Sequence, residues 1–243
     1  MIPTDDRVVI ITGAGSGIGK AIAIECSKHY PIVCLIGRSL DKLELVAEYA
    51  RKFCSKVYCY GVDLTSCADI KNFCIEINNQ WGHVDVLVHC AGIFSRGSIE
   101  DAPVDEFDRQ FFTNVRGPYY LTQLLLPLIR KKKGQIVFIN SSVGLTGGRA
   151  NISQYVATKQ ALKAIADSLR EEVNSDGLRI ISVYPGRTAT PMQQEICRAE
   201  GKRYQPKIFS HPEDIAKIVL NALFVSRSSE VTDIVIRPMK KGK

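Results

Sequence analysis

Short apolar runs, rich in β-branched residues, alternate with longer amphipathic segments along the whole chain. Nearly continuous apolar runs indicate strands covered on both faces, which are parallel strands joined by helical crossovers. The alternation predicts an α/β protein with three layers, in which a doubly wound, seven-stranded parallel sheet lies between two layers of helices. The expected strands are 8–12, 32–36, 56–61, 84–89, 135–140, 179–184 and 231–236, and the expected helices are 17–29, 40–53, 67–80, 104–130, 153–174 and 212–225.

No segment rich in Pro, Gly and Ser divides the 243 residues, and no internal repeat or low-complexity stretch is visible. We therefore expect one domain, 1–243, that binds its ligands at the carboxyl ends of the strands. Hydrophobic residues make up 45% of the chain and charged residues 23%, as in ordinary globular proteins. A chain of this size can form a substantial core without a disulfide or a structural metal.

The chain carries a formal net charge of +7, with small basic clusters at 130–133 and 240–243. We interpret these clusters as a solvated loop and a solvated tail. Nucleic-acid binding is the alternative, but no binding motif or interleaved aromatic pattern supports it, so no nucleic-acid partner is expected. No apolar run approaches ~20 residues, and the first apolar run has the pattern of a strand. The sequence therefore predicts no membrane span and a cytoplasmic protein.

None of the eight cysteines forms a Cys-x-x-Cys motif, and no His pair at metal-binding spacing accompanies them. Several lie within apolar periodic segments, where cysteine behaves as a small buried hydrophobe. We predict free thiols in a reducing compartment and no metal site. The cysteines are Cys26, Cys34, Cys54, Cys59, Cys67, Cys74, Cys90 and Cys197.

The first predicted strand leads into a glycine-rich turn, Thr-Gly-Ala-Gly-Ser-Gly-Ile-Gly, at 12–19. Gly13 permits a tight turn with positive φ, Gly17 lets a phosphate approach the backbone, and Gly19 lets the next helix pack closely. The N-terminus of that helix offers unpaired N–H groups and a positive dipole end to a pyrophosphate. The spacing Gly-x-x-x-Gly-x-Gly differs from the usual Gly-x-Gly-x-x-Gly, and a glycine-rich loop without a ligand is the alternative. We expect a Rossmann-type dinucleotide site that includes Gly13, Ser16, Gly17, Ile18 and Gly19.

The second predicted strand ends in Gly37-Arg38-Ser39, with no acidic residue to bind the ribose hydroxyls of NAD(H). A guanidinium pairs with phosphate through two parallel hydrogen bonds, so Arg38 predicts NADP(H) as the cofactor. The alternative is that Arg38 is an ordinary surface arginine. After the third strand, Asp63, followed by Leu64, is placed to accept a hydrogen bond from the adenine amino group.

Tyr155 and Lys159 are four residues apart in a predicted helix, and Ser142 lies thirteen residues before Tyr155. Residues four apart lie on nearly the same face of a helix. A nearby ammonium favours the phenolate, so we expect it to lower the pKa of Tyr155 and make this residue an acid or base near neutral pH. Ser142 can donate a hydrogen bond to the same substrate oxygen. Taken singly, these are a half-buried aromatic, a solvated lysine and a turn residue; behind a nucleotide-binding turn they predict hydride transfer to or from a carbonyl.

These motifs together resemble the short-chain dehydrogenase/reductase family, in its compact single-domain branch, from the first strand to the last. The turn at 12–19 matches the cofactor turn of the family, and Asn114 matches its catalytic asparagine, which holds a proton-relay water. Ser142, Tyr155 and Lys159 match the rest of its catalytic tetrad, and the resemblance implies that Lys159 also binds the nicotinamide ribose. The further cofactor contacts that we expect are Cys90, Ala91, Gly92, Pro185, Gly186, Thr188 and Thr190.

Two features depart from the pattern of the family. The sequence after the fourth strand is His89-Cys90-Ala91-Gly92, where the family has Asn-Asn-Ala-Gly, and the chain ends without the Asp-Gly-Gly signature of its β-ketoacyl reductases. The C-terminal segment is weakly similar to bacterial oxidoreductases that act on small hydroxy acids and other alcohols. The resemblance also implies a homodimer or homotetramer in which helices 104–130 and 153–174 pair across a two-fold axis.

The predicted function is an NADP(H)-dependent oxidoreductase that reversibly reduces a small-molecule carbonyl to an alcohol, with Tyr155 as the general acid. The alternatives are a non-catalytic NADPH-binding sensor on the same fold and an NAD-preferring hydroxy-acid dehydrogenase. We expect the segment 188–210 to form a short lid over the substrate. Its basic residues either face water or meet an anionic group of the substrate, and they are Arg198, Lys202, Arg203 and Lys207.

Overall fold

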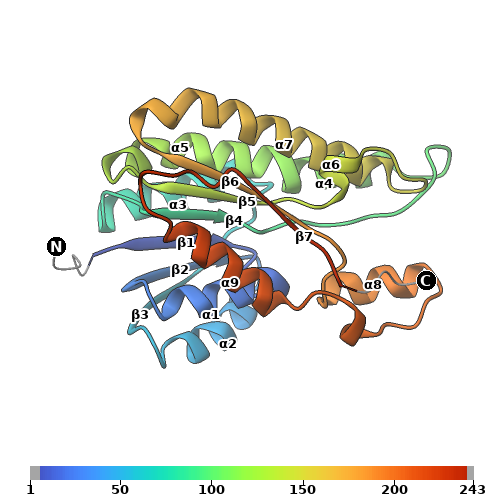
Figure 1. The fold of residues 1–243 in the computed structure, drawn as a ribbon, viewed down its shortest axis with the longest axis horizontal. Helices are drawn as coiled ribbons and strands as arrows, with labels where there is room; N and C mark the ends of the chain where they lie inside the picture. Colours follow the sequence, from blue (N-terminus) through green and yellow to red (C-terminus); the bar gives the residue numbers. More distant parts are fainter. Residues whose placement is uncertain (1–5, 240–243) are drawn as a thin grey trace.

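Seven parallel strands form one sheet in the computed structural model, which describes residues 6–239 (Figure 1). The strand order is β3-β2-β1-β4-β5-β6-β7, and every neighbouring pair is parallel. This confirms the predicted doubly wound Rossmann fold. The strands are β1 (Val8–Thr12), β2 (Ile32–Gly37), β3 (Lys56–Gly61), β4 (Val86–His89), β5 (Gln135–Ile139), β6 (Arg179–Pro185) and β7 (Asp233–Ile236).

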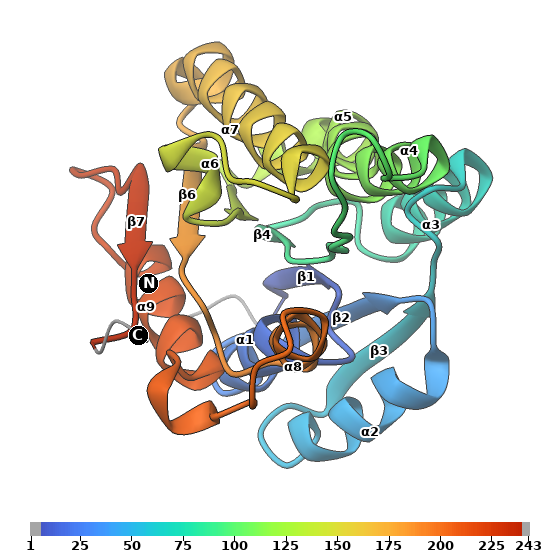
Figure 2. The ribbon, with the colours of Figure 1, turned by 90° about the vertical axis from the view of Figure 1, so that its right-hand side faces the viewer.

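Helices cover both faces of the sheet (Figure 2). One apolar core lies between the sheet and α1, α2 and α9, and a second lies between the sheet and α3, α5 and α7. Successive side chains of a strand point to opposite faces, so Val9 and Ile11 of β1 join the first core and Val8 and Ile10 the second. The helices are α1 (Gly17–Ser27), α2 (Leu40–Ala50), α3 (Cys67–Gln80), α4 (Val104–Phe111), α5 (Gly117–Lys131), α6 (Val143–Thr146), α7 (Ser153–Val173), α8 (Pro191–Ala199) and α9 (Pro212–Leu223).

The strand order reverses between β1 and β4. From β1 the chain moves outward to β3, then returns to place β4 on the other side of β1 and continues to β7. The connections that leave β1 and β4 therefore diverge and leave a crevice beyond the carboxyl ends of these strands. Helix α8 lies beyond the same ends of the sheet (Figure 1).

The predicted helix 104–130 is interrupted, which corrects the expectation from the sequence. Helix α4 ends at Phe111, a π-helical turn spans Phe112–Arg116, and α5 begins at Gly117. Pro118 explains the change, because it has no N–H to donate to the carbonyl of the residue four positions earlier. That residue is Asn114, so the interruption falls at a predicted catalytic position.

The predicted lid segment contains a helix that the sequence analysis does not predict, α8. Thr190 caps this helix, since its Oγ1 accepts a hydrogen bond from the N–H of Gln193 at 3.2 Å, and Pro191 occupies the first turn. Both signals are visible in the sequence, but the apolar side of the helix is too short to show a clear period.

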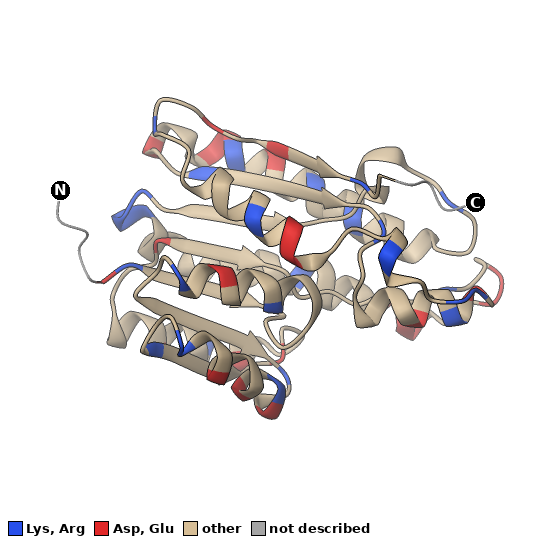
Figure 3. Ribbon diagram, turned by 60° about the horizontal axis from the view of Figure 1, so that its bottom comes forward, with Lys and Arg blue, Asp and Glu red and all other residues tan. Residues whose placement is uncertain are grey.

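Lys and Arg are scattered over the helices, with Asp and Glu between them (Figure 3). In the basic cluster at 130–133, Arg130 pairs with Asp176 at 2.9 Å. The second basic cluster, 240–243, lies outside the described residues. In the described part of the chain, no helix has the length and apolar character needed to span a membrane.

Candidate active site

A cavity of about 990 Å³ opens at the carboxyl ends of the strands, between the glycine turn after β1 and the loops after β4, β5 and β6. Every residue that the sequence analysis assigns to the cofactor lines this cavity. Of the predicted catalytic residues, Ser142, Tyr155 and Lys159 line it, whereas Asn114 lies behind its wall. The topology thus brings together residues separated by more than half of the sequence.

The glycine turn is packed so tightly that two of its positions admit no side chain. A Cβ atom on Gly13 would lie 2.8 Å from the backbone of Ala91, and one on Gly19 would lie 2.3 Å from the carbonyl oxygen of Gly13. Gly13 and Gly17 also have positive φ, at +66° and +53°. Helix α1 begins at Gly17 with no acidic residue in its first turn and no side-chain cap from Ser16. Its first N–H groups are therefore available to an anionic ligand.

Two cations line the cavity near the end of β2. Arg38 is exposed there, and Lys42, four residues later in α2, lines the same wall. A Cβ atom on Gly15 would lie 3.2 Å from the Cβ of Lys42, so this lysine stands against the glycine turn. Lys42 is not among the residues expected from the sequence. Nearby, Asp63 Oδ1 accepts hydrogen bonds from the N–H and hydroxyl of Thr65, both at 2.9 Å.

Tyr155 and Lys159 project from the first turns of α7 into the cavity. Lys159 is 4% exposed; its Nζ donates to the carbonyl of Ile139 at 3.2 Å and lies 5.8 Å from the centre of the Tyr155 ring. Burial raises the pKa of Tyr155 to about 12 and lowers the pKa of Lys159 to about 8. The expectation that the tyrosine pKa is lowered is therefore wrong for this structure, because desolvation has the largest effect on it.

Ser141 and Ser142 both line the cavity into which Tyr155 projects. Burial has the larger effect on the pKa of Tyr155, and a side-chain hydrogen bond with Ser141 opposes it. The backbone of Ser142 is held in the turn after β5: its N–H donates to the carbonyl of Pro185 at 2.9 Å, and its carbonyl accepts from the Thr146 hydroxyl at 3.2 Å. The role of Ser142 in orienting the substrate oxygen stays a prediction, and Ser141 is a second candidate for that role.

The side chain of Asn114 holds the loop that follows β4. It is 1% exposed, and its amide accepts from the N–H of Ile93 at 2.8 Å and donates to the carbonyl of Ile93 at 2.9 Å. The amide also donates to the hydroxyl of Thr158 at 3.1 Å. Because residue 118 is proline, the backbone carbonyl of Asn114 lacks the donor that an α-helix would supply. The side chain is thus occupied in positioning the loop, and the backbone carbonyl is the group that Asn114 can offer to a water.

Thr12 fixes the loop after β4, in which His89 and Cys90 stand where the family has two asparagines. The hydroxyl of Thr12 accepts hydrogen bonds from the N–H groups of Cys90 and Ala91, both at 3.0 Å. Burial raises the pKa of the Cys90 thiol to about 12, although Lys159 acts in the opposite direction. The thiol is therefore neutral, and the loop is held through its backbone whatever side chain residue 90 carries.

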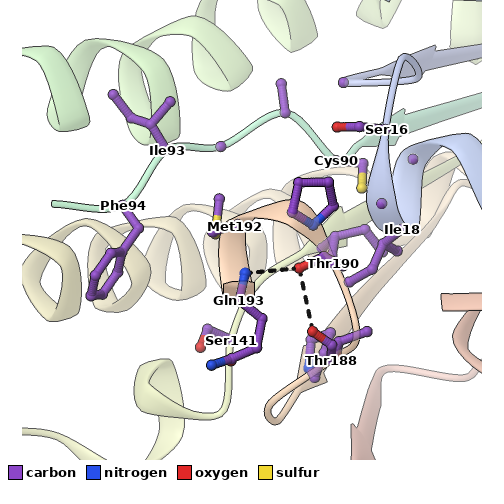
Figure 4. Close-up of a pocket in the computed structure, with 18 of the residues that line it drawn as sticks. Ser16, Ile18, Cys90, Ile93, Phe94, Ser141, Thr188, Thr190, Met192 and Gln193 are labelled. Atoms are coloured by element: carbon purple, nitrogen blue, oxygen red, sulfur yellow. Dashed lines mark hydrogen bonds between the residues drawn. The ribbon is translucent and has the colours of Figure 1, made fainter. Parts of the chain in front are cut away.

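The start of α8 closes the cavity against the glycine turn. A Cβ atom on Gly17 would lie 3.1 Å from the Cγ2 of Thr190. Thr190 is joined by hydrogen bonds to Thr188 and Gln193, while Ser16, Ile18 and Cys90 lie together at one side of the view and Phe94 at the other (Figure 4). Of the four basic residues expected in the lid, Lys202 alone lines the cavity, whereas the other three are exposed elsewhere on the segment. The cavity is also lined by arginines that the sequence analysis misses: Arg96, Arg149 and Arg187.

The doubly wound sheet, the glycine turn at its switch point and the pair of Tyr155 and Lys159 in the same cavity define a dinucleotide-dependent oxidoreductase. A family model described as short chain dehydrogenase matches residues 7–201. The chain belongs to the short-chain dehydrogenase family.

Similar proteins cover nearly the whole chain. The sepiapterin reductase of Chlorobaculum tepidum is 29% identical over 239 residues, which are 96% of this chain and 96% of the relative. An alcohol dehydrogenase from the archaeon Thermococcus sibiricus, solved in complex with 5-hydroxy-NADP, is 25% identical with a TM-score of 0.87, covering 98% of this chain and 99% of that one. A metagenomic short-chain oxidoreductase in complex with NADP is 26% identical with a TM-score of 0.83, covering 97% and 98%.

Proposed function

We propose that this protein is an NADP(H)-dependent oxidoreductase that reversibly reduces a small-molecule carbonyl to an alcohol. The observation that carries the proposal is the meeting of Tyr155, Lys159 and Ser141 in the cavity that the glycine turn enters. A nicotinamide cofactor supplies or takes up the hydride when it is bound. The side chains of the protein then have to handle one proton and the charge that develops on the substrate oxygen.

The residues around the cavity fit NADP(H) from end to end. The N–H groups of α1 suit the pyrophosphate, and Arg38 with Lys42 suits a 2′-phosphate. Two of the similar structures, the Thermococcus alcohol dehydrogenase and the metagenomic oxidoreductase, carry NADP-type ligands, which supports the same choice here. We assign the nicotinamide end to the loops after β4 and β6, with Thr188 and Thr190 beside the phosphates.

Tyr155 donates its proton to the substrate oxygen, and Ser141 donates a hydrogen bond to the same atom. Lys159 stays largely protonated at neutral pH, because its pKa is about 8. Its ammonium stabilises the phenolate that remains after proton transfer. The backbone carbonyl of Asn114 holds a water that carries the replacement proton toward Lys159.

The two alternatives fit less well. A sensor that only binds NADPH needs neither a proton donor nor a buried lysine, and burying an ammonium lowers the stability of the fold. An NAD-preferring hydroxy-acid dehydrogenase would place an acidic residue at the end of β2, where this chain has Arg38 and nearby Lys42.

NADPH is expected to support turnover of a panel of ketones and aldehydes with a kcat/KM at least about tenfold above that of NADH. Arg38→Asp should remove that preference, because a charge-assisted hydrogen bond contributes about 1.5–3 kcal/mol. Lys20→Asp, at an exposed position of α1 outside the cavity, serves as the matched control and should keep it. Equal rates with the two cofactors in the unmodified protein would contradict the assignment. Tight NADPH binding without consumption of NADPH over the whole panel would favour the sensor.

The two serines can be separated by substitution. Ser141→Ala is expected to lower kcat by about 10²-fold, the loss typical of one donor to a developing oxyanion. Ser142→Ala should change kcat little, because the structure uses the backbone of Ser142. NADPH binding, followed by fluorescence titration, should be unchanged in both. A larger loss for Ser142→Ala would return the role to the serine that the spacing suggests.

Large apolar side chains are exposed along α4 and the start of α5. Val104 is 71% exposed and Tyr119 is 52% exposed. We propose that this surface pairs across a two-fold axis in a homodimer or homotetramer, since apolar patches of this kind mark association sites. The eight cysteines are all free thiols in the structure, and we propose a reducing, cytoplasmic location on that ground.

A further inference from the structure

We propose that the substrate carries a carboxylate, which binds at a positively charged rim of the cavity formed by Arg96, Arg149 and Arg187. The inference rests on the proposed function, because it names the class of carbonyl compound that the same cavity takes. It differs from the expectation of a charged lid, since the cations that line the cavity lie mostly on other segments.

Three separate segments meet at this rim. The loop after β4 carries Arg96, and the N–H of Gly97 donates to the carbonyl of Asn151 at 3.0 Å, which ties that loop to the one carrying Arg149. The third segment follows β6 and carries Arg187. Glu200, at the end of α8, joins the segment of Arg187 to the loop of Arg96. Its carboxylate accepts two hydrogen bonds from Arg187, at 2.7 and 2.8 Å, and lies 4.0 Å from Arg96.

The rim has an excess of positive charge. Lys202 also pairs with Glu200, at 3.1 Å, so one carboxylate is shared among three cations. The side chain of Arg149 has no hydrogen bond or ion pair with any residue in 6–239. Four cations against one carboxylate leave three positive charges at this end of the cavity. A positively lined cleft raises the local concentration of anions and their association rate.

The rim lies within reach of the reacting group. The ring of Phe94 packs edge-on against Tyr155, with centroids 5.1 Å apart. Arg96 is two residues further along the same loop, at most about 7 Å of extended chain. Apolar side chains line the same cavity, among them Ile93, Ile152 and Met192. The cavity can therefore take a compound whose carbonyl lies at Tyr155 and whose carboxylate lies at the rim, a short distance away.

Glu200 holds the rim in place without neutralising it. Burial raises the pKa of this carboxyl, but hydrogen bonds from Arg187 and Lys202 outweigh burial and bring the pKa below its ordinary value. The group is therefore ionised, and both of its oxygens accept hydrogen bonds from one nitrogen of Arg187, Nη2. Arg187 keeps further N–H groups beyond those that Glu200 engages. Arg96 lies near the same carboxylate, and Arg149 lines the cavity from the loop that Gly97 joins to the Arg96 loop.

The test compares each oxo acid with its methyl ester: pyruvate with methyl pyruvate, and 4-oxopentanoate with methyl 4-oxopentanoate. The kcat/KM with NADPH is expected to be higher for an acid than for its ester. Arg149→Gln should lower the acid-to-ester ratio by about tenfold or more, as expected for the loss of one charge-assisted hydrogen bond. Arg198→Gln, on the exposed side of α8 outside the cavity, is the matched control and should leave the ratio unchanged.

Two further measurements test the rim: the salt dependence of kcat/KM and the affinity for NADPH. Raising NaCl from about 50 mM to about 500 mM should lower kcat/KM for the acid and leave that of the ester unchanged, because salt screens charges beyond several ångströms. The melting temperature and the NADPH dissociation constant of Arg149→Gln should match the unmodified protein. If NADPH binding weakens in this variant while the acid-to-ester ratio stays the same, the rim serves the cofactor and the inference is overturned.

The remaining outcomes separate the inference from the proposed function. Turnover of the esters alone, or an acid-to-ester ratio that Arg149→Gln does not change, overturns the inference and leaves the carbonyl reductase intact. No consumption of NADPH with any acid or ester, or with the wider carbonyl panel, overturns both. A phosphate-bearing pair, dihydroxyacetone phosphate against dihydroxyacetone, is the last arm. A larger preference there than in the carboxylate pairs would overturn the choice of carboxylate.

Discussion

Replacing Tyr155 by Phe is expected to lower kcat for carbonyl reduction by at least ~10²-fold, the low end for loss of a general acid. The ring remains, so its edge-on packing with Phe94 and the shape of the cavity are kept. The phenolic proton is lost, and with it the proposed donor to the substrate oxygen. The variant should therefore bind NADPH as the unmodified protein does but no longer consume it, with both measured on the same preparation.

Tyr58→Phe is the matched control for this change. Tyr58 lies on β3, packs against Trp81 and does not line the cavity, so its variant should keep full turnover. If Tyr155→Phe retained most of its activity with an unchanged pH profile, the phenol would not be the proton donor, and Ser141 or a water would have to take that role.

Lys159→Met is expected to move activity and stability in opposite directions. Turnover should fall by at least ~10²-fold, because the ammonium that stabilises the phenolate is gone. The free energy of unfolding should rise by up to about 3 kcal/mol, since burial lowers the pKa of Lys159 from 10.5 to about 8 and each pKa unit corresponds to about 1.4 kcal/mol. Thermal unfolding near neutral pH should show this as a higher melting temperature for the variant.

The pH dependence of the stability gained by Lys159→Met identifies its cause. Between about pH 8 and 10.5 the unfolded chain binds a proton at Lys159 that the folded chain has released, so the stability of the unmodified protein rises with pH in this window. The advantage of Lys159→Met should therefore be complete below pH 8 and vanish near pH 10.5. A constant difference across this range would mean that the variant gains stability from packing, and not from removal of a buried charge.

The fold follows closely from the order of apolar runs and amphipathic segments. The parallel sheet and the two helical layers could be predicted because buried strands are apolar throughout, as in Val8–Thr12, whereas edge strands such as Lys56–Gly61 are not. The glycine turn could also be predicted from the residue types alone. Backbone contacts as close as those at Gly13 and Gly19 exclude every other residue type.

The finer features of the site depend on three-dimensional surroundings that no spacing records. Whether Ser141 or Ser142 faces the phenol is decided by the turn after β5. The pKa of Tyr155 depends on how much solvent the surrounding segments exclude, which the Tyr-x-x-x-Lys motif does not contain. The charged rim escapes the sequence analysis because its arginines come from three distant segments that only the fold brings together.

The pairing of β1 with β4 has a consequence for how the protein acquires its cofactor. Val9 lies beside Val86, and the hydroxyl of Thr12 binds the backbone of Cys90, so the glycine turn is completed by residues that follow it far along the chain. A growing chain that has reached only β3 contains the whole turn but lacks the wall against which Gly13 packs. Contacts between such distant positions form late and slowly. We therefore expect the dinucleotide to act on molecules in which this wall has formed. There, mass action slows their loss by unfolding and makes the lifetime of the protein depend on the supply of its dinucleotide.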